Sequence, residues 1–422
     1  MTQENSAEWA ALKACGTPLL NPEQLRKSVE RVDWRALLDL AEEHGVTQLT
    51  AARLNGILSD APGGVSDREE NSPELGGGEL SDLEVEIPKT NSTLSSVNAS
   101  AGWRATLTEI LRAQAFFTLR MSAELFRLEE RFAASGIEMM TVKGPALAVQ
   151  AYGDAAMRKY GDLDFVMRDR DIAAATQLMM DAGYAAEIPL STIAAGKIPG
   201  QYMFRQAATK LLVELHSERT MRYYPRRLPL EKLFARRARV NIEGRTVPAP
   251  SAEDHLVIIC VHGAKHFWEK LLWIADVAAL ISRTTEMRWA LVEESARDVG
   301  AETMLHGGLL LAAGILQTPL PAEVLQRARA DGAARAMTRQ VLEWLPQAGE
   351  ARPEFQRGLL RRAFFRMRMR GGAFAGVGYF LRLLFSPTEE DWGEAGDGRR
   401  GIAEILKRPF RLARKHGSGD KG

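Results

Sequence analysis

Two aspartates separated by one residue constrain this chain more than any other feature. Asp162 and Asp164 lie in residues 161–167, a short segment with the alternation of a β-strand. Because side chains alternate between the two faces of a strand, both aspartates are expected on one face, roughly 7 Å apart along the chain. Two carboxylates on one rigid face favour a Mg²⁺ site, since Mg²⁺ takes one or two carboxylates together with phosphate oxygens and water.

A second apolar segment, residues 211–216, supplies a third carboxylate. Its alternation places Glu214 and His216 on the same face. If this strand pairs beside the aspartate strand, Glu214 joins Asp162 and Asp164 in a cluster that can hold two metal ions about 3.5–4 Å apart. Glu214 would then bind a metal, take the proton of an acceptor hydroxyl, or do both. The pattern leaves these roles open.

The turn before the aspartate strand suits the binding of a triphosphate. Lys143, Gly144 and Pro145 follow an apolar segment that reads as a strand. Proline is favoured in a first helical turn, and glycine lets the backbone come close to a ligand. A helix that begins here would direct its free N–H groups at a phosphate. Lys143 and Arg158 would add positive charge where the leaving group becomes negative.

In this order, the residues resemble the polymerase-β-like nucleotidyltransferase superfamily. Within it, the chain is most similar to a bacterial family described only as uncharacterised nucleotidyltransferases. The residues that carry the resemblance are Lys143-Gly144, Tyr152, Arg158, Asp162-x-Asp164, Glu214-Leu215-His216 and the block from His262 to Asp276. The resemblance covers residues 105–285 well. It implies an α+β fold, with a small mixed sheet flanked by helices and with helical N-terminal and C-terminal parts.

The resemblance also implies a site. Asp162 and Asp164 match the paired metal aspartates of the superfamily, and Glu214 matches its third acidic position. These three residues are therefore predicted to be both the catalytic residues and the metal ligands. Lys143 and Gly144 stand where the superfamily usually has Gly-Ser at its triphosphate-binding turn, so a serine hydroxyl is missing here. The predicted nucleotide-binding residues are Lys143, Gly144 and Arg158.

Weaker candidates for contact with the substrate or its phosphates are His216, His262, Lys265, His266 and Asp276. The pair His262 and His266, at i and i+4, superficially suggests a zinc helix. However, the residue after His262 is Gly263 rather than the glutamate of a metalloprotease motif. A histidine pair on an apolar helix is ordinarily structural. Here the match to the family's helical block favours a substrate-facing position, with Asp276 orienting Lys265 or His266.

The length of 422 residues predicts two or three domains, and the composition of 45% apolar and 26% charged residues is that of a globular protein. The expected segments are a helical N-terminal segment (1–58), a disordered linker of acidic, Gly and Ser residues (59–101), the nucleotidyltransferase α/β core (102–250), a helical domain that completes the active-site cleft (251–347), and a basic helical C-terminal region with a disordered tail (348–422).

The remaining features bear on location and partners. Cys15 and Cys260 are the only cysteines, which excludes a disulfide framework and a cysteine-rich zinc site. The first residues show no signal-peptide pattern, so a cytoplasmic protein is expected. A net charge of +1 argues against general binding to nucleic acid. Arginines interleave with apolar residues over 357–370 and 405–415. They either place the protein on an anionic membrane surface or polyanion, or solvate the outer face of packed helices.

Together these features predict a Mg²⁺-dependent nucleotidyltransferase. It would move a nucleoside monophosphate from an NTP to a hydroxyl-type acceptor and release pyrophosphate. Two Mg²⁺ ions, with Mn²⁺ as a substitute, are expected on the three carboxylates. The NTP, with ATP among the candidates, the acceptor (a small molecule, sugar, peptide or protein) and the oligomeric state stay open. The alternatives are a catalytically inactive nucleotide-binding or regulatory module, and a membrane-peripheral interaction protein that acts through the Arg-rich helices.

Overall fold

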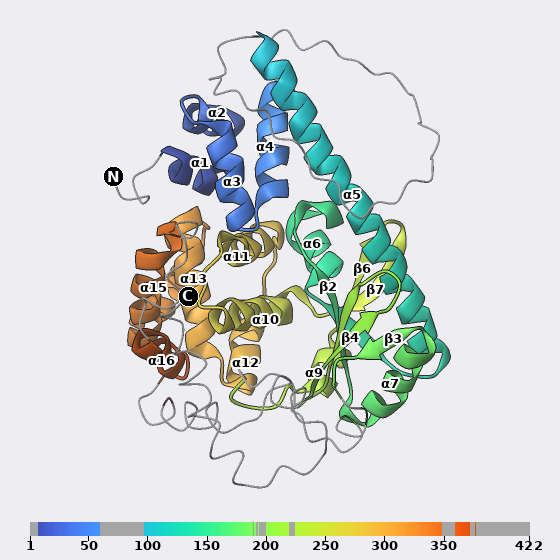
Figure 1. Cartoon of the computed structure of the whole chain (residues 1–422). Helices are drawn as coiled ribbons and strands as arrows, with labels where there is room; N and C mark the ends of the chain where they lie inside the picture. The colour runs from blue at the N-terminus through green and yellow to red at the C-terminus, as the bar shows by residue number, and fades with distance from the viewer. Residues whose placement is uncertain are drawn as a thin grey trace, which may run out of the picture.

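The computed structural model of the chain places a small β-sheet with its helices beside a group of helices that faces it (Figure 1). The predicted α+β fold, with a small mixed sheet flanked by helices and with helical N-terminal and C-terminal parts, is confirmed. The structure describes residues 7–59, 97–188, 190, 193, 200–218, 224–347, 359–371 and 376.

The sheet is built around the two segments whose alternation carries the carboxylates. Its strands, in spatial order, are β1 (Met139–Val142), β2 (Asp162–Met167), β5 (Leu212–His216), β4 (Gln201–Gln206) and β3 (Tyr184–Ala186). β2 and β5 pair in parallel, and the other neighbours are antiparallel. The sequence analysis expects β1, β2 and β5, and residues 202–206 of β4 also read as a strand. It missed β3, because three residues are too few to show a period.

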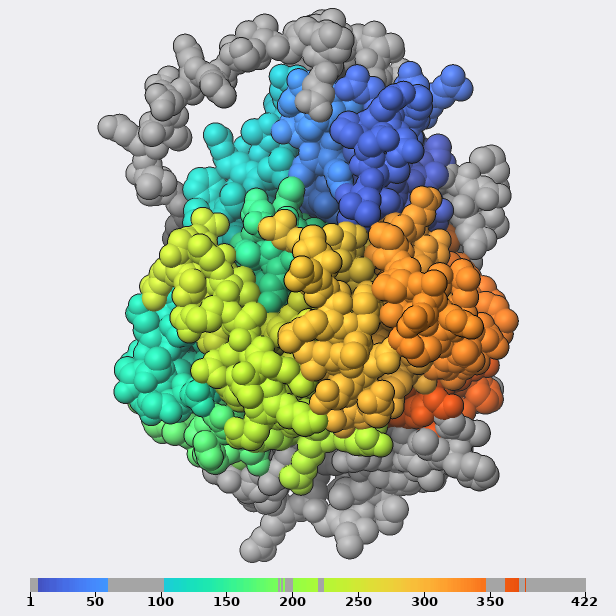
Figure 2. All heavy atoms as spheres, turned by 180° about the vertical axis from the view of Figure 1, so that it is seen from behind, coloured from blue at the N-terminus to red at the C-terminus, as the bar shows by residue number. Residues whose placement is uncertain are grey.

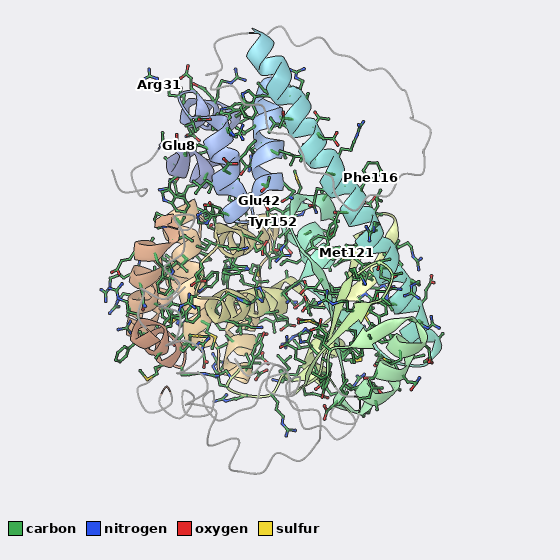
Figure 3. The ribbon with its side chains drawn as sticks, in the orientation of Figure 1. Glu8, Arg31, Glu42, Phe116, Met121 and Tyr152 are labelled. Atoms are coloured by element: carbon green, nitrogen blue, oxygen red, sulfur yellow. The ribbon has the colours of Figure 1, made fainter. Side chains whose placement is uncertain are left out.

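The face of the sheet away from the carboxylates packs on helices. Phe165 of β2 meets Phe132 of α5 (Val97–Ala134) edge to face, with ring centroids 5.8 Å apart. Met121 on the same helix is buried in this core, whereas Phe116 is 42% exposed; both are labelled in Figure 3. α7 (Ile172–Asp181) completes the layer. The aspartates are thus held on a strand whose other face is locked in a core.

The helices that face the sheet begin where a short hairpin ends. Ser251 caps α10 by accepting the N–H of Asp254. The hairpin strands are β6 (Ala238–Ile242) and β7 (Arg245–Ala249), preceded by α9 (Leu230–Ala235). The helices are α10 (Ala252–Lys265), α11 (Leu271–Arg283), α12 (Trp289–Val299), α13 (Glu302–Leu316), α14 (Ala322–Ala330), α15 (Gly332–Trp344) and α16 (Leu359–Arg368).

The N-terminal helices share one apolar core with α10, α11 and α13. Figure 2 shows them, in blue, next to the light-blue α5 and above the yellow and orange helices. They are α1 (Ala7–Gly16), α2 (Pro22–Val29), α3 (Trp34–Glu43) and α4 (Thr47–Ser59). The segment therefore buttresses the helical half of the molecule.

The described part of the basic C-terminal region packs on other helices. Phe365 of α16 is fully buried, and Arg362 forms an ion pair with Glu269, with N and O 2.7 Å apart. The guanidinium carbons of Arg362 and Arg366 lie 4.9 and 5.1 Å from the ring centroid of Phe267. Both guanidinium groups therefore lie over the same aromatic ring.

Some of the expected segments lie partly or wholly outside the residues that the structure describes. Most of the expected linker 59–101, namely residues 60–96, and the whole basic stretch 405–415 lie outside the described residues. α5 begins at residue 97, within the segment that was expected to be linker. Within the described residues, no helix combines the length and apolar character that crossing a bilayer requires.

A buried ion pair joins the sheet half to the helical half. Arg158, which precedes β2, donates from Nε to both carboxylate oxygens of Asp276 on α11, at 2.9 and 3.0 Å. The hydroxyl of Tyr152, labelled in Figure 3 at the end of α6 (Gly144–Tyr152), donates to the same carboxylate at 2.9 Å. Arg158 is 5% exposed and Asp276 is 1% exposed. The attraction is therefore weakly screened by solvent.

His44, at the end of α3, caps the start of α11. Its Nδ1 accepts the N–H of Leu271 at 3.2 Å, and its backbone oxygen accepts the N–H of Leu272 at 3.1 Å. Two N–H groups that a helix leaves unpaired are satisfied in this way. Burial, together with the positive charge of Lys270, lowers the pKa of His44 to about 4. The ring is therefore neutral and can accept a hydrogen bond.

We expect acid to destabilise the fold through His44. The unfolded chain has the ordinary histidine pKa of 6.5 and the folded chain one of about 4, so the unfolded state binds the proton first as the pH falls. The contribution of the neutral His44 ring to the free energy of unfolding is fully present above pH 6.5. It is lost towards pH 4, by up to about 3 kcal/mol. Urea denaturation between pH 7.5 and 4.5 measures it. His44→Gln, whose amide oxygen accepts without titrating, should show a flatter dependence; an unchanged slope would contradict the assignment.

We also expect Asp276→Asn to destabilise the protein strongly, by about 3–5 kcal/mol, because the guanidinium of Arg158 is then buried without a countercharge. Denaturant titration at neutral pH measures the loss. The matched control is Glu187→Gln, which breaks an exposed pair with Arg205 of β4. It should cost less than about 1 kcal/mol. Similar losses in the two variants would rule out a structural role for the buried pair.

Candidate active site

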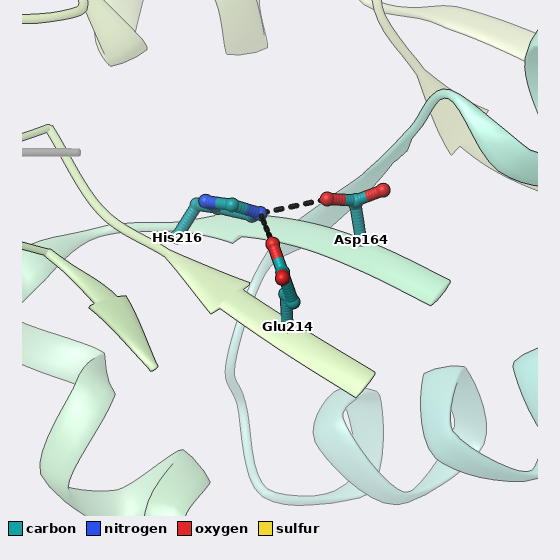
Figure 4. Close-up of side chains that lie close together, drawn as sticks. All are labelled: Asp164, Glu214 and His216. Atoms are coloured by element: carbon teal, nitrogen blue, oxygen red, sulfur yellow. Dashed lines mark hydrogen bonds and ion pairs between the residues drawn. The ribbon is translucent and has the colours of Figure 1, made fainter. Parts of the chain in front are cut away.

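The register of β2 and β5 brings two of the predicted carboxylates together. Asp164 is the direct pairing partner of Glu214 across the parallel strands. Figure 4 shows both side chains, with that of His216, on the same face of the sheet. One oxygen or nitrogen from each of the three lies within 4.8 Å of the others. The alternation in the sequence predicts which face of each strand carries these side chains, and the pairing of β2 with β5 brings them together.

His216 lies between the two carboxylates. Its Nε2 is 2.8 Å from Oδ1 of Asp164 and 3.3 Å from Oε2 of Glu214 (Figure 4). Burial by itself lowers the pKa of His216, but the hydrogen bonds to both carboxylates outweigh it, and the pKa is raised. The raised pKa favours the protonated ring, whose positive charge offsets part of the negative charge of the cluster.

Lys143 supplies a second countercharge. Its Nζ is 2.8 Å from Oδ1 of Asp164, and that carboxylate is 1% exposed. Burial raises the pKa of Asp164, but the Lys143 ammonium and the hydrogen bond from His216 hold it well below its usual range. Asp164 is therefore ionised, with positively charged groups against one of its oxygens.

Asp162 lies at the edge of this cluster. Burial and the negative charge of Asp164 raise the pKa of Asp162 to about 6, although Lys143 acts in the opposite direction. The group within 4.8 Å contains His216 and not Asp162, whereas the sequence analysis assigned the metal to Asp162, Asp164 and Glu214. The site thus holds three crowded carboxylates and one imidazole, with Asp162 slightly apart.

The residues present fit a divalent cation. Oδ2 of Asp164 is buried and has no hydrogen-bond partner, although a carboxylate oxygen rarely stays unpaired in a protein interior. Carboxylate oxygens suit Mg²⁺ and Mn²⁺, and an imidazole nitrogen is a common ligand of transition metals. Lys143 and His216 both lie against Oδ1 of Asp164, so Oδ2 is the oxygen of this carboxylate that a cation would use.

The predicted phosphate turn lies against the aspartate strand. α6 begins at Gly144, where φ is +44°, and Pro145 occupies its first turn. A Cβ atom at Gly144 would lie 3.6 Å from the backbone oxygen of Asp162. Space would therefore permit a side chain, and the positive φ is what favours glycine. The start of a helix and an aspartate of the cluster are immediate neighbours.

Arg158 and Asp276 are bound to each other instead of facing an open site. Asp276 was expected to orient Lys265 or His266, and in the structure it accepts hydrogen bonds from Arg158 and Tyr152. The charge of Arg158 still reaches the cluster, since it lowers the pKa of Asp162. Arg158 therefore contributes to the site by holding it in position and by its electric field.

The weaker histidine candidates form an aromatic cluster beside the site. The rings of His262 and His266 are 4.7 Å apart, and His266 stacks on Trp273 with centroids 5.0 Å apart. Burial lowers the pKa of His266 to about 3 and that of His262 well below its ordinary value; the charges of Lys143 and Lys265 contribute to both shifts. The two rings are therefore neutral. The sequence places them on one face, and the structure adds Trp273.

One residue of the site was not among the candidates. His255, on the first turns of α10, accepts the backbone N–H of Lys143 at Nε2, at 2.9 Å. The signal in the sequence is the spacing of His255, His262 and His266, at i, i+7 and i+11, which places the three histidines near one face of the helix. The contact joins residues 112 positions apart, so no local pattern could have revealed it.

Comparison with known proteins identifies a family. The sequence model of a family described as "Uncharacterised nucleotidyltransferase" matches residues 30–317, which include the whole sheet, the cluster, α10 and α11. Comparison with curated proteins and with solved structures gives no match. The chain belongs to this uncharacterised nucleotidyltransferase family.

Proposed function

We propose that the protein transfers a nucleoside monophosphate from an NTP to a hydroxyl-type acceptor, with a divalent cation, Mg²⁺ or Mn²⁺, at the carboxylate cluster. Membership of a nucleotidyltransferase family supports nucleotidyl transfer as the general reaction. The acceptor oxygen would bond to the α-phosphorus while the bond to the bridging oxygen of pyrophosphate breaks. The acceptor is a small molecule, sugar, peptide or protein.

The observation that carries the proposal is the pairing of Asp164 with Glu214 in register on parallel strands. It puts two carboxylates side by side on a rigid sheet, with Asp162 two residues before Asp164 on the same face. When bound, a divalent cation supplies charge to the phosphate oxygens and lowers the pKa of an acceptor hydroxyl. We assign Asp164 and Glu214, with Asp162 beside them, to hold one or two such ions. Glu214 also takes up the acceptor's proton.

Lys143 and Gly144 would seat the phosphates. In this structure, the ammonium of Lys143 serves as the countercharge of Asp164. With a divalent cation held by the carboxylates, the positive charge of Lys143 would offset the negative charge that builds up on the leaving pyrophosphate. The N-terminal end of α6 adds the favourable end of a helix dipole at the same place.

The neutral rings of His262 and His266, with Lys265 next to His266, are proposed to line the path of the acceptor or the nucleotide. Both histidines lie close enough to Lys143 for its charge to lower their pKa values. Neutral imidazoles offer both a hydrogen-bond donor and an acceptor, which suits a hydroxyl-bearing molecule.

We expect Asp164→Asn and Glu214→Gln each to lower nucleotidyl transfer at least about 100-fold, because each removes a carboxylate that would hold the cation. The assay supplies each of the four labelled NTPs with Mg²⁺ and a set of acceptors, and follows pyrophosphate release and labelled product. The matched controls are Asp181→Asn and Glu187→Gln, which alter exposed carboxylates of the same fold. Parent-level transfer by folded Asp164→Asn would refute the assignment.

Binding can be tested without an acceptor. We expect Mg²⁺ with a suitable NTP to stabilise the parent, by about 2.7 kcal/mol at a free ligand concentration 100 times Kd, because the ligand binds only the folded state. Chemical denaturation measures the shift, and EDTA should remove its metal-dependent part. Asp164→Asn should lose the shift, and Asp181→Asn should keep it. An equal shift in Asp164→Asn would place the binding site elsewhere.

A further inference from the structure

The backbone at Lys143 adopts a conformation that ordinary residues avoid. Its φ is 54° and its ψ is −140°, a region that is used almost only by glycine. Such a conformation costs a non-glycine residue about 1–3 kcal/mol and persists only where the surroundings enforce it. Lys143 is also the residue whose ammonium reaches the carboxylate cluster. Something must therefore hold this turn in place.

Three contacts hold Lys143, one at each of its polar groups. Its backbone oxygen accepts the N–H of Leu147 at 2.9 Å, which is the first hydrogen bond of α6. Its ammonium is 2.8 Å from Asp164. Its backbone N–H donates to Nε2 of His255 at 2.9 Å. The first contact belongs to the helix and the second to the site. The third contact, to His255, is the one that fixes the backbone from outside the helix and the carboxylate cluster.

His255 is itself fixed in the orientation that this contact needs. Its ring is fully buried, and Nδ1 is 2.6 Å from the side-chain oxygen of Gln150. The amide nitrogen of Gln150 donates to the backbone oxygen of Pro250 at 2.9 Å, so the amide oxygen faces His255. The proton of the neutral ring is therefore on Nδ1, which leaves Nε2 as an acceptor. Burial lowers the pKa of His255 to about 3, which agrees with a neutral ring.

We propose that His255 is a positioning residue for the phosphate-binding turn. With Gln150 behind it, His255 locks Lys143 in its positive-φ conformation, and so directs the ammonium at the cluster while α6 starts at Gly144. The part of this inference that concerns nucleotide binding rests on the proposed function. A glycine at 143 would adopt this backbone freely but would carry no ammonium. The lock lets a lysine occupy a position whose backbone favours glycine.

The first test uses the protein without any ligand. Hydrogen–deuterium exchange at the amide of residue 143 should be slow in the parent and in His255→Gln, whose side-chain oxygen can replace Nε2. It should be at least tenfold faster in His255→Leu, which keeps the volume and removes the acceptor. The control is His44→Leu, which removes a buried histidine far along the chain and should leave this amide protected. Equal exchange in the parent and His255→Leu overturns the lock.

The second test measures affinity for Mg²⁺-NTP by calorimetry, at a temperature where every variant is folded. His255→Leu should weaken binding at least tenfold, whereas His255→Gln and His44→Leu should stay within threefold of the parent. In a Lys143→Gly background, where the turn needs no lock, His255→Leu should change affinity less than threefold. An equal tenfold loss in both backgrounds overturns the proposal. If the parent binds none of the four NTPs, the proposed function fails, and the exchange experiment still decides on the lock.

Discussion

The parallel pairing of β2 with β5 is the constraint on which the rest of the site depends. It sets Asp164 opposite Glu214 and leaves Asp162 and His216 on the same face. Because a shift of one residue would turn every side chain of a strand to the opposite face, the register is as important as the residues themselves. The opposite face of β2 carries Phe165, which is fully buried in the core. Moving the carboxylates would therefore mean unpacking that core.

Crowded carboxylates in a protein interior are costly, and the fold offsets that cost with its own cations. Lys143 and His216 both reach Oδ1 of Asp164, while Oδ2 of the same carboxylate has no partner. The negative charge of Asp164 is thus neutralised, while one of its two oxygens still lacks a hydrogen-bond partner. The compensating groups occupy Oδ1, and the unpartnered Oδ2 is the oxygen that the proposed cation would use. The stability of the ligand-free protein and its proposed capacity to bind a cation therefore depend on the same carboxylate.

Much of this site is predictable from local pattern, because its carboxylates lie on strands with clear alternation. The positions of Asp162, Asp164 and Glu214 and the helix that starts at Gly144 all follow from a few consecutive residues. The contacts that hold them do not. Arg158 meets Asp276 across 118 positions, so neither residue indicates its partner. For the same reason, the sequence suggested a nucleotide contact for Arg158, and the structure shows its guanidinium held by Asp276.

The same reasoning explains why His255 was not among the predicted site residues and why it matters. A catalytic motif records the residues that touch a ligand, and those residues are only as accurate as the backbone that carries them. At Lys143 that backbone is strained, and strain at a functional position persists only where neighbours enforce it. The enforcing residue need not resemble a catalytic group or lie near one in sequence. It needs only a buried acceptor at the correct distance, which is what α10 delivers when Ser251 caps it one turn before His255.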